Sequence, residues 1–175
     1  MGAFSLDVRA FVEKTKQNNE TVMRQVTLKL FSAIIKASPV DTGRFRMNWQ
    51  AAGGLPASGV LPGEDKSGES AIAAMTNFVT KSDYWTDFTL TNNLPYAEVI
   101  EFGGYPTGFT GPERPDASSL ASFQGPMKLS SFVGPKRQRE QKTVNGYSKQ
   151  APQGVVRVNI TRFNALLEAE AAKVR

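Results

Sequence analysis

Apolar residues recur at three- and four-residue steps through the first part of the sequence, from Leu6 to Ala37. This spacing places them along one side of a helix, so the sequence predicts a long N-terminal helix. Ser5 is suited to cap its start, and the helix is predicted to end at Ser38-Pro39, because a residue before proline leaves the α conformation. Three polar residues at 17–19 interrupt the apolar side and predict a bend or break. The apolar positions are Val8, Phe11, Val12, Val22, Met23, Val26, Leu30, Ala33, Ile34 and Ala37.

Residues 44–50 alternate strictly between polar and apolar after a tight turn at 41–43. A period of two is typical of a half-buried strand. The apolar side of this predicted strand holds Phe45, Met47 and Trp49, and the polar side holds Arg44, Arg46, Asn48 and Gln50. Arg44 and Arg46 are therefore expected to form a basic stripe on the face opposite the core.

The middle of the chain predicts short elements separated by turns. Residues 53–68 are rich in glycine and proline and are predicted to form a loop. Residues 70–80 suit a short helix, and residues 85–91 suit a second strand. After two asparagines, Pro95 fits the first turn of a short helix through Phe102.

The C-terminal segment fits two patterns. Residues 155–160 alternate like a strand, but apolar residues at helical spacing also run through them and onward. Pro152 is well placed at a helix start, and the residues after Phe163 favour helix. The sequence predicts a helix that begins near Pro152 or Gly154, with a strand up to Ile160 as the alternative.

These elements predict an α+β fold in a single domain over residues 1–175, with a long N-terminal helix and a C-terminal helix packed on a small antiparallel sheet. A long irregular insertion, residues 104–146, is rich in Pro, Gly and Ser and lacks a sustained period. It carries six Lys and Arg against three Asp and Glu, and its four aromatic residues are too many for a simple linker. We expect an extended arm that folds onto a neighbour.

Neither cysteine nor histidine occurs among the 175 residues. Disulfides, thiolate nucleophiles and most metal and acid–base sites that work near neutral pH are therefore excluded. The adjacent Ser and Lys pairs, the carboxylate pairs and the glycine doublets lack the surrounding motifs of catalytic, calcium or phosphate sites. We predict no enzyme activity, no catalytic residue, no cofactor and no metal. Apolar runs are too short to cross a bilayer, so no membrane contact is expected.

The net charge of +5 and the pI of about 9.6 favour an acidic partner. A protein surface and nucleic acid both fit this charge, and a solvated face is the alternative for the two strand arginines. The Lys136–Arg139 cluster could touch phosphates but has no nearby stacking aromatics. The candidate partner or DNA contacts are Arg44, Arg46, Lys128, Lys136, Arg137, Arg139 and Lys142.

Three separate segments form an ordered combination. They are residues 38–46 (SPVDTGRFR) followed by Trp49, residues 90–97 (LTNNLPYA) continuing to Glu101, and residues 148–152 (SKQAP). In this order they resemble the neck and tail-completion proteins of long-tailed bacteriophages, a family of small α+β proteins found where tail meets head. The family would have almost nothing between Gly103 and Tyr147, so the resemblance also marks 104–146 as an insertion.

The resemblance implies a virion structural protein that completes the tail and joins it to the head connector as part of a ring. The implied partners are other copies of the chain in a hexamer, the head connector and tail tube proteins, and packaged DNA. The implied location is the head–tail junction of the virion, after assembly in the host cytoplasm. A tail terminator that caps the tail tube is an alternative. A nucleic-acid-binding protein acting through the basic arm is an alternative of another class.

Overall fold

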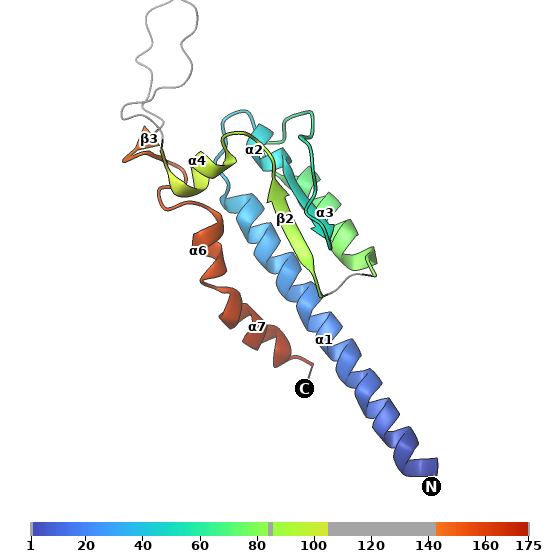
Figure 1. Ribbon diagram of the computed structural model, residues 1–175. Helices are drawn as coiled ribbons and strands as arrows, with labels where there is room; N and C mark the ends of the chain where they lie inside the picture. The colour runs from blue at the N-terminus through green and yellow to red at the C-terminus, as the bar shows by residue number, and fades with distance from the viewer. Residues whose placement is uncertain (1, 84–85, 105–142, 175) are drawn as a thin grey trace, which may run out of the picture.

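The computed structural model describes residues 2–83, 86–104 and 143–174, with side chains from Val8 onward. The longest element of the fold is helix α1 (Gly2–Ala37), and the other elements pack along it, as Figure 1 shows. On one side of α1 lie helix α3 (Glu69–Lys81) and a sheet of two strands, β1 (Trp49–Gly53) and β2 (Phe88–Asn92). On the other side lie α6 (Val156–Ile160) and α7 (Phe163–Ala171).

Short elements gather near the C-terminal end of α1 (Figure 1). They are α2 (Arg44–Met47), α4 (Ala97–Phe102) and a hairpin of β3 (Thr143–Val144) and β4 (Tyr147–Ser148). The predicted α+β class, with a long N-terminal helix, a C-terminal helix and a small antiparallel sheet, is confirmed. Of the predicted arm, residues 105–142 lie outside the described residues.

Helix α1 is continuous through residues 17–19, so the predicted bend or break there is wrong. The Asn18 Nδ2 donates to the Val174 carbonyl at 2.9 Å, so this polar residue binds the C-terminal segment and leaves the helix backbone intact. The helix begins at Gly2, which places Ser5 inside it and not at its cap. Its end agrees with the prediction: the Ser38 hydroxyl donates to the Ile34 carbonyl and accepts from Trp49 Nε1 at 2.7 Å.

The strand predicted over 44–50 is wrong for its first half. Residues 44–47 form the single helical turn α2, and the strand begins only at Trp49. The Met47 amide donates to the Gly43 carbonyl at 2.9 Å, which closes the helical turn. Phe45 and Trp49 are both buried and their rings meet edge to face at 5.7 Å between centroids. Residues four apart meet on a helical turn, so this pair fits a helical period as well as an alternating one.

The other predicted elements are confirmed with shifted ends. The helix predicted over 70–80 is α3, the strand over 85–91 is β2, and the helix through Phe102 is α4. Residues 54–68, predicted as a loop, contain no helix or strand. The C-terminal segment is helical, so the strand alternative up to Ile160 is wrong, and an unpredicted break at 161–162 divides it into α6 and α7.

The core lies where α1, α3 and the inner face of the sheet meet. Strands β1 and β2 pair antiparallel from Trp49↔Asn92 to Gly53↔Phe88. Ile35 of α1 and Val79 of α3 have no exposed surface. The buried cluster comprises Phe31, Ile34, Ile35, Phe45, Trp49, Ala71, Met75, Val79, Leu94, Ile100, Ala151 and Val155. Among the described residues, none of the helices has the length and apolar character needed to cross a membrane.

Candidate functional site

The three sequence segments that carry the family resemblance meet in space near the C-terminal end of α1. The side-chain amide of Gln150, from the third segment, makes both of its hydrogen bonds to Val40, from the first. Gln150 Oε1 accepts from the Val40 amide at 2.7 Å, and Gln150 Nε2 donates to the Val40 carbonyl at 2.8 Å. This pairing holds together two segments that are 110 positions apart in the sequence.

The two asparagines of the second segment join it to the first segment and to the loop over residues 54–68. Asn92 Nδ2 donates to the Phe45 carbonyl at 2.9 Å, and the Phe45 and Tyr96 rings lie 6.0 Å apart. Asn93 Nδ2 donates to the carbonyls of Ala57 and Gly59 at 2.9 and 3.0 Å. The amide side chains therefore satisfy backbone acceptors that the two short strands cannot reach.

Glu101, at the end of α4, caps the start of α6. Its carboxylate accepts from the backbone amides of Val155, Val156 and Arg157 at 2.7, 2.8 and 2.9 Å, and the Arg157 side chain also pairs with it. A helix N-terminus has unsatisfied N–H groups and favours negative charge. Burial alone would raise the pKa of Glu101, but the three amides and Arg157 outweigh it, and the pKa is lowered.

Gly154 allows the close approach of these two segments. Its φ of +82° is in the left-handed region, and a Cβ at this position would lie 2.5 Å from the Glu101 carbonyl oxygen. Both the backbone conformation and the missing side chain are therefore required here. Gly43 in the first segment meets the same two conditions, with φ of +99° and the backbone of Asp65 against it.

Arg46 does not lie on an outward strand face, because residues 44–47 are helical. Its guanidinium donates to the carbonyls of Lys36 and Ser38 at 2.8 Å each, and to the Lys66 carbonyl at 2.7 Å. It therefore caps the C-terminal end of α1, where carbonyl groups lack helical partners and positive charge is favoured. The guanidinium of this predicted contact residue is engaged within the chain.

Arg44 is exposed, and its side chain has no polar partner among residues 2–83, 86–104 and 143–174. It is the member of the predicted pair whose charge is available to a partner. The other five candidates, Lys128, Lys136, Arg137, Arg139 and Lys142, lie outside the described residues. The structure thus separates Arg44 from Arg46, which the sequence pattern placed on one stripe.

Two further charged caps were missed by sequence reasoning. Arg24 of α1 donates to the Val79 carbonyl and, at 2.6 Å, to the Ser82 carbonyl, at the C-terminal end of α3. Asp65 accepts from the Ser67 hydroxyl and from the Gly68 and Ser70 amides at the start of α3, and these bonds, led by Ser67, lower its pKa. The cap by Asp65 could have been predicted, because an acidic residue shortly before a helix is a usual N-terminal signal. No local sequence pattern predicts the cap by Arg24.

Metal-binding clusters are absent from the part of the chain that is described. No group of three or more His, Cys, Asp or Glu side chains there could hold a metal ion. A shallow depression beside the end of α1 is lined by Ala37, residues 150–154, Val158 and Asn159, none of which is ionisable.

Comparisons with protein-family models, with curated proteins and with solved structures each found no match.

Replacing Glu101 with Gln should destabilise the fold by about 0.5–2 kcal/mol at neutral pH, because the charged cap of α6 is lost. The lowered pKa of Glu101 means that its carboxylate stabilises the fold above the ordinary pKa of 4.5 and ceases to do so as pH falls through the folded-state value. The difference between wild type and Glu101→Gln should therefore shrink at acidic pH, as measured by urea unfolding. Glu98→Gln, exposed on the same helix, is the control, and equal losses for the two variants would contradict the capping role.

Replacing Gly154 with Ala should cost more than replacing Gly59 with Ala. The two glycines have nearly the same φ, +82° and +84°, but nothing lies within 4 Å of a Cβ added at Gly59. Both variants incur the left-handed backbone penalty of about 1–2 kcal/mol, and only Gly154→Ala adds an overlap with Glu101. Thermal unfolding of both variants measures the difference. A Gly154→Ala loss no larger than that of Gly59→Ala would show that the α4–α6 approach is not tight.

Proposed function

We propose that this chain is a virion structural protein of the neck of a long-tailed bacteriophage, which completes the tail and joins it to the head connector as one subunit of a ring. The single observation that supports this most is the mutual bonding of the three segments that carry the resemblance. Gln150 pairs with Val40 and Asn92 pairs with Phe45, so the third and second segments are each bonded to the first. Glu101, to which the second segment continues, binds the start of α6, which follows the third segment. If the three segments resembled the family only by chance, there would be no reason for them to contact one another in the fold.

A joint between capsid and tail needs stable surfaces for neighbours more than it needs chemistry. A ring forms when head-to-tail contacts between identical subunits close on themselves, and such contacts use two different patches of one subunit. The described surface exposes large apolar side chains on several elements, among them Phe11 at 71%, Leu55 at 84% and Phe102 at 61%. These side chains are the natural contacts for copies of the chain and for adjoining virion proteins.

The proposed partners follow from the same role. They are other copies of the chain in a hexameric ring, the head connector and the tail tube proteins, at the head–tail junction. Arg44, exposed and without a described polar partner, is the predicted contact residue in the described part that could meet packaged DNA or an acidic neighbour. The five basic residues of the arm are proposed contacts from sequence alone.

Particles assembled without this protein test the joining role directly. We expect electron microscopy to show DNA-filled heads beside free tails of normal length, with joining restored by the wild-type chain supplied in trans. Overlong tails would instead assign the chain to tail termination. Normal infectious virions that lack the chain would overturn both roles.

DNA binding by the purified chain tests the alternative of another class. If the arm contacts neighbouring virion proteins and is not a dedicated nucleic-acid-binding element, Lys136→Ala/Arg137→Ala/Arg139→Ala should leave any weak duplex binding nearly unchanged. A nucleic-acid-binding arm predicts binding that falls steeply between about 50 and 200 mM salt, as counterions compete for the phosphates. Such binding, abolished by the triple variant but kept by Lys66→Ala/Lys81→Ala, would favour the alternative.

A further inference from the structure

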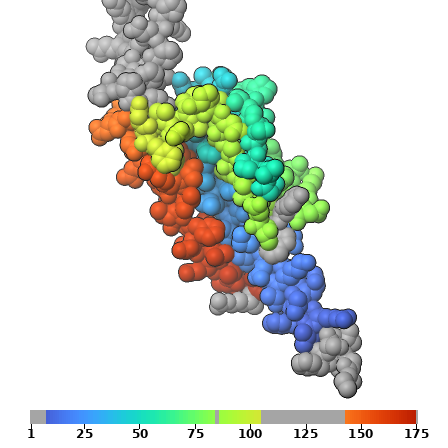
Figure 2. All heavy atoms as spheres, in the orientation of Figure 1, coloured from blue at the N-terminus to red at the C-terminus, as the bar shows by residue number. Residues whose placement is uncertain are grey.

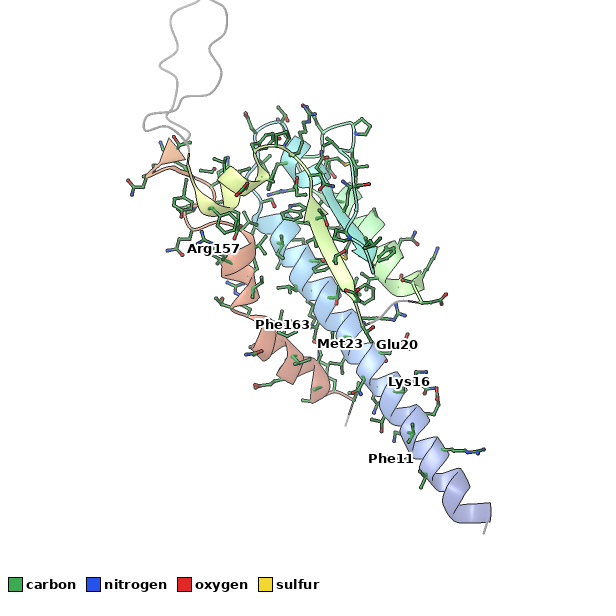
Figure 3. The ribbon with its side chains drawn as sticks, in the orientation of Figure 1. Phe11, Lys16, Glu20, Met23, Arg157 and Phe163 are labelled. Atoms are coloured by element: carbon green, nitrogen blue, oxygen red, sulfur yellow. The ribbon has the colours of Figure 1, made fainter. Side chains whose placement is uncertain are left out.

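The C-terminal segment is anchored in the core over its first half but not over its second. Val155, directly before α6, is buried, and the Glu101 carboxylate binds the amides at the start of α6. Among the described residues, α7 contributes no side chain to the buried cluster formed by α1, α3 and the sheet. Figure 3 shows Arg157 on the anchored helix and Phe163 at the start of α7. The joint at residues 161–162 therefore separates an anchored helix from one that lies outside the core.

Helix α7 lies along α1, on the side away from α3 (Figure 2), and polar side chains hold it there. Glu170 is its buried residue, at 5% exposed, and the apolar side chains of α7 are only partly buried or exposed. The Glu170 carboxylate accepts from Lys29 Nζ of α1 and, at 2.7 Å, from Lys173 Nζ just after α7. Asn18 of α1 donates to the Val174 carbonyl at 2.9 Å. The most buried side chain of α7 is therefore a carboxylate.

A contact of this kind opens at a lower cost than an apolar contact of equal size. A buried carboxylate gives up its hydration, and its ion pairs repay that loss with little net gain. When the contact opens, water solvates the carboxylate again. The side chains of Lys29 and Lys173 are already 46% and 60% exposed, so their hydration changes less. Elements of low local stability open separately while the core stays folded.

We propose that residues 163–174 form a releasable strap, which undocks from α1 as a unit about residues 161–162 while the core stays folded, and that the Glu170–Lys29 ion pair is its latch. Lys29 joins the strap to another element, whereas Lys173 is three positions from Glu170 on the strap itself. Release exposes the partly buried apolar side chains of α7 and the side of α1 that it covers. This inference concerns a motion of the subunit, and it does not depend on the proposed neck role.

Native-state hydrogen exchange of the full chain tests the strap. The amides of residues 166–172 lie in the hydrogen-bonded turns of α7, so they exchange when these turns open. In the wild type they should share one opening equilibrium and exchange at least about tenfold faster than the amides of residues 73–81 in α3, after correction for intrinsic rates. Rates that rise steadily from 166 to 172 would show fraying from the chain end and overturn the proposal. Exchange no faster than that of α3 would also overturn it.

Two lysine substitutions test the latch against each other. Lys29→Met removes the bond to α1 and should raise exchange across residues 166–172 by about tenfold, because a hydrogen bond to a charged group is lost. Exchange in α3 should not change. Lys173→Met is the matched control, because it removes the other lysine from the same carboxylate and keeps the bond to α1. It should change the α7 rates by no more than about twofold, as for a helical ion pair.

A conservative variant checks that the charge of Lys29 is what matters. Lys29→Arg should keep α7 exchange near the wild-type rate. The latch would be contradicted if Lys29→Met left α7 exchange unchanged, or if Lys173→Met raised it equally. An equal rise in α7 and α3 with Lys29→Met would show that α7 opens only when the whole fold unfolds, which would overturn the strap. These outcomes are independent of whether the chain is found in virions.

Discussion

The structure depends on charged side chains that satisfy the ends of helices. Arg24, Arg46 and Glu101 do so from another element, and Asp65 does so from just before its helix. Arg46 and Arg24 bind the free carbonyls at the C-terminal ends of α1 and α3, and Asp65 and Glu101 bind the free amides at the N-terminal ends of α3 and α6. In each case the sign of the charge matches the helix dipole. With only two small sheets in the described residues, the caps from Arg24, Arg46 and Glu101 supply polar contacts between elements that a larger sheet would provide.

Because some arginines cap helices, the positive net charge is not all available to an acidic partner. The net charge of +5 suggested an acidic partner, yet Arg24, Arg46 and Arg157 in the described part donate to backbone carbonyls. Arg44 remains exposed and is the predicted contact residue in the described part whose charge is available to DNA or an acidic surface. The proposed neck role therefore depends less on the total charge than on the contact surfaces that the fold leaves uncovered.

Much of the fold could be predicted because its helices have strong local signals. The apolar period of α1 and the Ser-Pro at its end were enough to predict its position. The helical spacing of the apolar residues over 70–80 predicted α3. The turn at 44–47 was mistaken for a strand because Phe45 and Trp49, four residues apart, fit both periods. Asn18 was interpreted as an interruption because its partner, the Val174 carbonyl, is 156 positions away. The roles of Arg46 and Glu101 could not be predicted for the same reason: a cap supplied from another segment leaves no local pattern.

A reconstruction of the head–tail junction in intact virions is the most direct test of the proposed role. If the chain is a neck subunit, the map should contain a closed ring between connector and tail tube whose subunits accommodate α1, the β1–β2 sheet and the α4–α6 junction. A junction fully accounted for by other proteins, with this chain missing from purified virions, would contradict it.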